Sequence, residues 1–326
     1  MQFRIKFPII SIIFISLCVS CNQDEVIIKD EEGNNGNSGQ EGFRPSTSDS
    51  TPFINKVYEW TPAPGQYIND FGPDISNEDQ ITPEQAADWA FQRIKNNYFV
   101  SLGAFGGYIV VGFDHSIKNT GDYEIGVIGN AFLSGNGNSN EPGIVYVMQD
   151  ENQNGLPDDT WHELKGSDTF AEGTVKDYVV TYYRPEKDGQ PVKWTDNFGN
   201  TGEVDYLGAF HSQPTYYPCW IDSETYSLSG TLLEAKTMKN PDTGNWENPP
   251  FKGGYADNIG EDNINFEGFS NCNRFKISDA INSQGNVVNI DYIDFVKIQT
   301  GVFSEAGWLG EVSTEVLGII DLTIPQ

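Results

Sequence analysis

Short segments in which apolar and polar residues alternate recur along the chain from residue 108 onward. In the clearest of them, Lys176–Arg184, Tyr178 and Tyr182 fall on one face while Val179 and Thr181 fall on the other. This period of two is typical of β-strands, whose successive side chains point to opposite faces. The alternation therefore constrains the fold to sheets rather than helices.

Eight such segments are predicted as strands, each bounded by Gly, Asn, Asp or Pro. They are Tyr108–Phe113, Tyr123–Ile128, Gly143–Met148, Lys176–Arg184, Ser227–Glu234, Arg274–Ile277, Asp291–Gln299 and Thr314–Leu322. Many short strands with little helix predict an all-β fold, a jelly-roll-like β-sandwich. No fixed internal repeat is present, which counts against a propeller.

One helix is predicted before these strands. Thr82 is an N-cap residue followed by Pro83, and Ala86, Ala90 and Ile94 fall on one stripe of a helix that should end near Asn96. Residues 57–68 contain two prolines and are predicted as an edge or lead-in strand.

The stretch Asp150–Glu163 has the spacing of a calcium-binding loop. Its oxygen-bearing residues follow the order of an EF-hand loop, with Gly155 at the sharp turn and Leu156 offering its carbonyl. Trp161 occupies the place of the usual twelfth-position Glu, and no helix precedes the loop, so a structural calcium site between two strands is predicted. The alternative is a solvated turn, since the same residues dominate ordinary turns. The predicted ligands are Asp150, Asn152, Asn154, Leu156, Asp158, Asp159 and Glu163.

The N-terminal sequence predicts that the protein is exported and anchored to a membrane by a lipid. Residues 1–20 have a basic head and a short apolar run, and the stretch that ends at Cys21 has the pattern of a bacterial lipoprotein signal. Cys21 is the predicted site of acylation and the anchor to the outer membrane. Residues 21–51 are predicted as a flexible acidic tether, and residues 52–326 as a single β-sandwich domain that binds a ligand. The acidic residues that follow Cys21 resemble the surface-export signal of Bacteroidota lipoproteins and imply a place on the cell surface.

The charge disfavours nucleic acid as a partner. The chain carries 47 Asp and Glu against 19 Lys and Arg, a formal net charge of −28. A surface of this sign repels phosphate backbones. An acidic surface also suits an environment rich in calcium, because bound ions relieve carboxylate repulsion. The two cysteines of the body, Cys219 and Cys272, fit either a disulfide or two buried thiols.

Two long loop-like regions, residues 196–227 and 238–271, are rich in aromatic residues. Long loops in a compact domain are usually functional, and clustered rings suit a ring-shaped or amphipathic ligand. The alternative is that the rings close the ends of the sandwich as core. The predicted ligand-binding residues are Tyr216, Tyr217, Trp220, Trp246, Tyr255 and His211.

The sequence favours binding over catalysis. Neither a His-Glu-x-x-His, nor a Gly-x-Ser-x-Gly, nor a phosphate-cradling glycine loop occurs, and only His115, His162 and His211 are histidines. We therefore predict that the protein is not an enzyme, although paired carboxylates are too common here to decide the matter.

Several stretches together resemble a known family. They are Phe105–Ile117, Gly129–Phe132, Glu141–Val147, the calcium-like loop through Leu164, Lys176–Arg184 and Ile293–Ile298. In order and spacing they are similar to Bacteroidota cell-surface lipoproteins, some with a PKD-like module, that occur beside outer-membrane cobalamin (vitamin B12) receptors. This chain has no room for that module.

The resemblance implies a jelly-roll-like protein that captures a corrinoid at the cell surface and passes it to an outer-membrane TonB-dependent transporter. A calcium-stabilised carbohydrate-binding or adhesion module remains the alternative, because it would use the same sandwich and the same aromatic loops.

Overall fold

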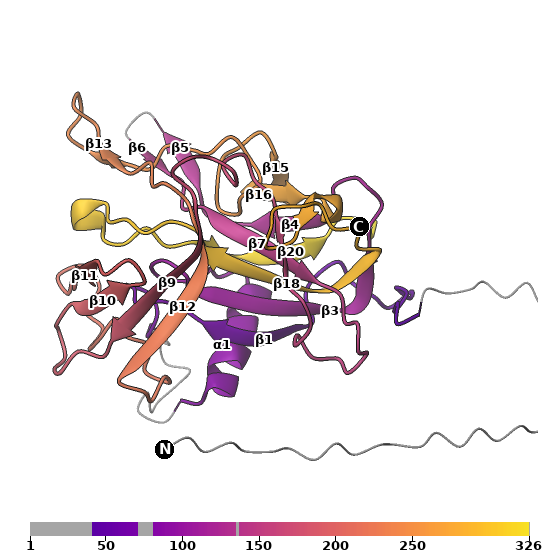
Figure 1. Ribbon diagram of the computed structural model, residues 1–326, viewed down its shortest axis with the longest axis horizontal. Coiled ribbons are helices and arrows are strands. Elements are labelled where there is room, and N and C mark those ends of the chain that lie inside the picture. Colours follow the sequence, from indigo (N-terminus) through magenta and orange to yellow (C-terminus); the bar gives the residue numbers. More distant parts are fainter. Residues whose placement is uncertain (1–40, 71–80, 135–136, 326) are drawn as a thin grey trace, which may run out of the picture. The chain divides into compact units, whose positions relative to one another are not determined.

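Two antiparallel sheets share one core and form a β-sandwich (Figure 1). The six-stranded sheet has the order β1 (Lys56–Thr61), β3 (Tyr108–Lys118), β18 (Tyr292–Thr300), β7 (Gly143–Met148), β8 (His162–Leu164) and β17 (Ala280–Ile281). The four-stranded sheet has the order β15 (Asn263–Phe266), β16 (Phe269–Phe275), β4 (Ile125–Ile128) and β20 (Gly318–Asp321). Val111 and Val296 of the first sheet lie in the same core as Val127 and Ile319 of the second.

The topology joins early strands to late ones in both sheets. β3 pairs with β18, and β4 pairs with β16 and β20. Pairing of this kind is typical of the Greek-key windings of a jelly roll. The prediction of an all-β, jelly-roll-like sandwich with one helix is confirmed, and all eight predicted segments contain strand.

This computed structural model describes residues 41–70, 81–134 and 137–325. They belong to one compact unit that starts at residue 40. The predicted signal peptide, Cys21 and the first part of the predicted tether lie outside the described residues.

The end of the predicted tether belongs to the folded body. Arg44 donates to Asp294 of β18 at 2.9 Å, and the Ser116 N–H donates to the Arg44 carbonyl at 2.8 Å. Phe43 lies edge-on to Tyr292, with ring centroids 5.3 Å apart. The boundary at residue 52 is therefore too late, because these long-range contacts fix residues that have a loop-like composition.

Helix α1 (Pro83–Lys95) begins and ends where its capping residues predict. Thr82 accepts from the Gln85 N–H, Gln85 accepts from the Thr82 N–H, and Asn96 is the C-cap. This reciprocal capping box satisfies two N–H groups that the first turn leaves open. Trp89 of α1 stacks on Trp60 of β1 at 5.3 Å, so the helix covers the outer strand of the six-stranded sheet (Figure 1).

A third sheet has its own core. It has the order β11 (Thr201–Val204), β10 (Val192–Asp196), β9 (Val175–Tyr183) and β12 (Thr225–Leu232). Tyr178, Val180 and Tyr182 of β9 point into this core, which confirms the face predicted from their alternation.

Short elements complete the fold. The two-stranded pairs are β2 (Val100–Ser101) with β19 (Glu315–Val316), β5 (Phe132–Ser134) with β6 (Gly137–Ser139), and β13 (Met238–Lys239) with β14 (Trp246–Glu247). In the described residues, the 3₁₀ turns η3 (Ile277–Asp279) and η4 (Gly307–Leu309) lie in the connections. Among the described residues, no helix has both the length and the apolar character needed to cross a bilayer.

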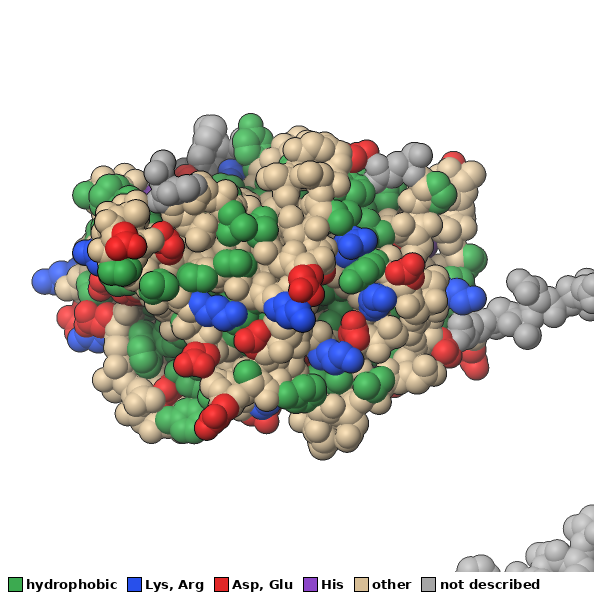
Figure 2. Space-filling view, turned by 90° about the horizontal axis from the view of Figure 1, so that it is seen from above, with side chains coloured by type: hydrophobic (Ala, Val, Ile, Leu, Met, Phe, Trp, Pro, Cys, Tyr) green, Lys and Arg blue, Asp and Glu red, His purple; other side chains and the backbone are tan. Residues whose placement is uncertain are grey.

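Figure 2 shows one face of the protein, on which Lys and Arg side chains lie among Asp and Glu side chains and scattered hydrophobic groups. Neither sign of charge dominates this face.

Candidate functional site

The predicted calcium loop folds so that its carboxylate and amide groups converge. Asp150 accepts from the N–H groups of Asn154 at 3.1 Å and Gly155 at 2.8 Å, and Gly155 has the positive φ of +74° that the sharp turn needs. The Asn154 side chain lies 2.9 Å from an oxygen of Asp158. The Asp150 N–H donates to Asp294 at 2.9 Å, which fixes the start of the loop to β18.

Asn152 and Asp159 close the other side of this loop. The Asn152 amide lies 3.1 Å from Asp158 and 3.3 Å from Asp159, and Asp159 accepts from the Glu151 N–H. The side chain of Leu156 is exposed. The amide nitrogens of Asn152 and Asn154 face Asp158, and their amide oxygens accept from backbone N–H groups of the loop. Calcium binding there stays a prediction.

Glu163 lies apart from the calcium loop. Lys176 donates to both of its carboxylate oxygens, at 2.7 and 2.8 Å, and Thr231 donates to one of them at 2.5 Å. These bonds hold Glu163 against the β9–β12 sheet. We therefore leave Glu163 out of the proposed ligand set.

Most of the aromatic residues predicted to bind ligand are core residues. Tyr216 and Tyr217 are 0% exposed and lie in the core of the third sheet, Trp220 packs on Trp60 at 4.8 Å, and Tyr255 packs on Phe251. They present no ring face to solvent. The alternative that these rings close the body as core is the one that the structure supports.

Trp246 instead lines a large cavity between two hairpins, and we call this space the Trp246 cavity. The β5–β6 and β13–β14 hairpins project from the same side of the sandwich (Figure 1), and the Asn248 N–H donates to the Asn138 carbonyl at 2.8 Å to join them. The η4 turn forms a further wall, and the cavity holds about 590 Å³. This volume is within the range of small-molecule sites.

Exposed apolar side chains line the rim of the Trp246 cavity. Trp308 is 57% exposed, and Phe132 and Leu309 are also exposed although both line the cavity. Gly307 has a φ of +57°, and a Cβ there would lie 2.2 Å from the Trp246 indole nitrogen, so only glycine allows the η4 turn to approach that ring. Exposed rings over a concave site are typical of ligand contact.

The floor of the cavity is acidic. Glu141, Glu311 and Glu315 line it, and Asp257 is buried directly beside them. Glu311 accepts from the Gln66 backbone at 2.7 Å.

Burial and mutual repulsion raise the pKa of these carboxyls. Burial raises the pKa of Glu311 to about 8. Burial, and then the charge of Glu315, raise the pKa of both Glu141 and Asp257 well above the ordinary range. Without a counter-charge such groups hold protons near neutral pH, and a protonated carboxyl can donate a hydrogen bond or act as a general acid.

His211 reaches the same cavity through Tyr67. The Tyr67 hydroxyl lies 3.1 Å from His211 Nε2, and Tyr67 is part of the cavity wall. Burial lowers the pKa of His211, which favours the neutral imidazole. Of the six predicted ligand residues, Trp246 lines the cavity and His211 supports its wall.

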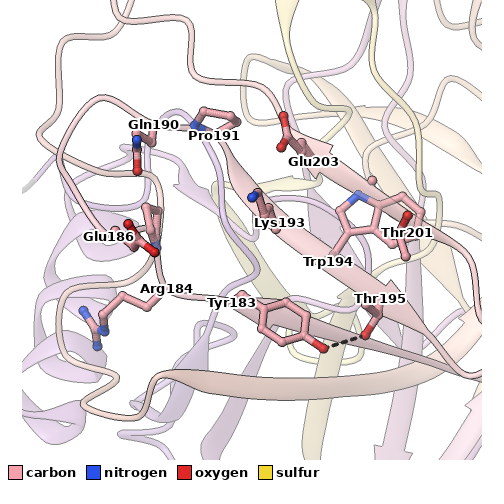
Figure 3. Close-up of a pocket in the computed structure, with 12 residues that line it drawn as sticks. Tyr183, Arg184, Glu186, Gln190, Pro191, Lys193, Trp194, Thr195, Thr201 and Glu203 are labelled. Atoms are coloured by element: carbon pink, nitrogen blue, oxygen red, sulfur yellow. Dashed lines mark hydrogen bonds between the residues drawn. The ribbon is translucent and has the colours of Figure 1, made fainter.

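A second, larger cavity of about 860 Å³ lies over the outer face of the third sheet (Figure 3). Tyr183, Lys193 and Glu203 lie side by side there on β9, β10 and β11, and Tyr183 shares a 2.9 Å hydrogen bond with Thr195. The side chains that line it are exposed or half-buried. Polar side chains that are already solvated add little binding free energy when they exchange water for a ligand. The Trp246 cavity is therefore the stronger candidate site.

No protein-family profile matches this chain, and a search of curated proteins finds no similar sequence.

The acidic floor is the part of the site that sequence reasoning missed. Glu141, Asp257 and Glu315 come from three distant segments, and each is one acidic residue among 47. No local spacing marks them.

Proposed function

We propose that this protein is a surface lipoprotein that captures a corrinoid in the Trp246 cavity and passes it to a TonB-dependent outer-membrane transporter. The observation that carries the proposal is the pairing of an exposed aromatic rim, formed by Trp308 and Phe132, with a polar floor. A corrinoid has a flat macrocycle edged with amide side chains. Rings can cover the macrocycle while Asn, Ser and Glu side chains bind the amides. The family resemblance of Phe105–Ile117 and its companion segments adds to this support.

The cavity supports binding without chemistry on the ligand. Capture needs contact area and hydrogen bonds; the apolar rim supplies the first and the polar floor the second. Large rings should dominate the affinity, because a few buried aromatic contacts carry most of the binding energy in such sites. The acylated Cys21 would hold the protein at the membrane where the transporter lies.

Titration of the purified chain with cyanocobalamin and with cobinamide, in calcium-containing buffer, tests the proposal. Trp246→Ala or Trp308→Ala should weaken binding by about 2 kcal/mol, roughly 30-fold. Phe170→Ala is the matched control, because Phe170 is exposed but does not line the cavity. If the folded chain binds neither corrinoid at micromolar concentration, the proposal fails.

Hand-over to a transporter needs a separate test. The corrinoid-loaded chain should associate with an outer-membrane TonB-dependent corrinoid receptor, and labelled corrinoid should appear on that receptor. Retention of all the label on the lipoprotein in the presence of the receptor would contradict the transfer step.

A carbohydrate ligand is the second candidate. The acidic floor favours it, since carboxylates and the Asn248 amide suit hydroxyl groups while Trp308 offers a face for a sugar ring. A glycan array that includes a check for hydrolysis products distinguishes the outcomes. Glycan binding without corrinoid binding would replace the first proposal, and hydrolysis would show an enzyme.

A further inference from the structure

Three carboxylates meet at the floor of the Trp246 cavity. Glu141, Asp257 and Glu315 each place an oxygen so that all three lie within 4.8 Å of one another. Glu141 precedes β7, Glu315 belongs to β19, and Asp257 lies in the loop before β15. The Glu141 N–H donates to the Asp257 carbonyl at 2.9 Å, and the Glu315 N–H donates to Asp257 Oδ2 at 3.0 Å. Backbone hydrogen bonds therefore hold the three segments together.

No side chain of opposite charge compensates these carboxylates. Asp257 and Glu315 are buried, and in the described part of the chain no Lys, Arg or His forms an ion pair with any of the three. Buried carboxylates at such separations are costly unless a positive charge joins them.

An independent feature at the same place is an unsatisfied amide oxygen. Asn271 is 1% exposed, and its Oδ1 has no hydrogen-bond partner. If residue 129 carried a Cβ in place of the glycine hydrogen, that atom would lie 2.4 Å from Asp257 Oδ1 and 2.5 Å from Asn271 Oδ1. Both oxygens therefore lie beside Gly129. Asp257 Oδ1 accepts from the N–H groups of Asn130 at 2.8 Å and Ala131 at 2.7 Å, whereas Asn271 Oδ1 has no donor.

The orientation of the Asn271 amide is fixed by its nitrogen. Nδ2 donates to Asn263 Oδ1 at 2.7 Å and to the Asn258 carbonyl at 3.1 Å. A flipped amide would set its oxygen against both acceptors, so the oxygen must face Asp257. Asn248, which lines the cavity, has a second buried amide oxygen without a partner.

We propose that Glu141, Asp257 and Glu315 bind a divalent cation at the floor of the Trp246 cavity, which the unpartnered Asn248 amide also lines, and that the cation is calcium. The donors are all hard oxygens, which suit calcium, and the separation fits ligands at about 2.3 to 2.6 Å from one ion. The site is distinct from the loop around Asp150, and its ion binding does not depend on what the cavity captures.

Calcium stoichiometry on the purified full-length chain tests this site. The chain is stripped with EGTA, dialysed against calcium, and its bound metal is measured by mass spectrometry. Glu141→Gln/Glu315→Gln should bind one equivalent fewer than wild type, because the substitutions remove two charges while keeping the shape. Asp150→Asn/Asp158→Asn, in the calcium loop, should keep the equivalent that belongs to the cluster.

The proposal is overturned if the Glu141→Gln/Glu315→Gln variant keeps the wild-type stoichiometry, or if wild type binds no calcium; the carboxyls would then hold protons instead. If the double variant does not fold, wild-type crystals soaked with a lanthanide give a second readout. An anomalous peak between the three carboxylates is expected, and its absence at saturating lanthanide would reject the site. Neither measurement contains a corrinoid, so failure here is separate from failure of the proposed capture function.

Discussion

The Nε2 of His115 lies 2.8 Å from Oδ2 of Asp321, and both side chains are only 1% exposed. His115 belongs to β3 of the six-stranded sheet and Asp321 to β20 of the four-stranded sheet. This pair therefore joins the two layers of the sandwich through the core. Asp114 contacts the other ring nitrogen of His115, but its side chain is 38% exposed.

Asp321→Asn should destabilise the fold more than Asp114→Asn. The first change disturbs a buried pair and should cost about 1 to 3 kcal/mol, because a buried group loses its partner. The second disturbs a solvent-screened contact to the same imidazole and should cost less than about 1 kcal/mol. Urea unfolding of both variants checks this, and equal losses would contradict the role of burial.

Lys297 should make stability rise with pH above about 8. Its ammonium group lies 4.3 Å from the Tyr146 ring centre and 5.0 Å from that of Trp161, and burial lowers its pKa to about 8. In the unfolded chain the pKa is about 10.4, so between the two values the unfolded state binds more protons. The contribution to stability then rises with pH, by at most about 1.4 kcal/mol per unit.

Comparison with Lys297→Met isolates this effect from the tyrosines. The difference in unfolding free energy, wild type minus variant, should increase from pH 8 to pH 10 and stay flat from pH 6 to pH 7. A difference that stays flat or falls over the upper range would show that the pKa of the lysine is not lowered in the folded protein.

Calcium should stabilise the body through the loop around Asp150. At a free concentration about 100 times the Kd, one bound ion adds about 2.7 kcal/mol. Asp158→Asn should reduce the shift in Tm that EGTA produces, whereas Glu163→Gln should leave that shift unchanged, since Glu163 binds Lys176 instead. An equal EGTA effect in the Asp158→Asn variant and in wild type would argue against the loop as a calcium site.

Cys21→Ser should release the protein from the membrane fraction. The lipoprotein signal makes Cys21 the only acylation site we predict, and acyl chains supply the anchoring energy. Detergent partitioning and surface labelling of cells measure the loss. Continued retention of the variant would reveal a second anchor.

The fold was predictable where local chemistry decides it. Thr82 and Pro83 mark the start of α1, and the alternation around Tyr178 and Tyr182 marks β9 and its buried face. The sheet partner β10 was missed, because Val192–Asp196 is short and has Trp194 as its one large ring.

The site was less predictable, because it depends on how deeply each side chain is buried and on segments that are far apart in the sequence. Tyr216 and Trp246 both stand in aromatic-rich, loop-like regions of the sequence. Tyr216 is nevertheless buried in the core of the third sheet, whereas Trp246 lines the cavity. The convergence of Glu141 with Glu315 is a product of strand pairing between β2 and β19 and of the loop at Asp257, and neither leaves a local pattern.

Two walls of the Trp246 cavity belong to hairpins that stand outside the sandwich core, while its floor is tied to the strands. The tips of β5–β6 and β13–β14 can therefore change in length and residue type at little cost to folding. Under the proposed function, substitutions at the rim can alter which molecule the cavity accepts while the acidic floor keeps its residues. The range of ligands that the cavity is proposed to accept and the stability of the fold thus depend on separate parts of the chain.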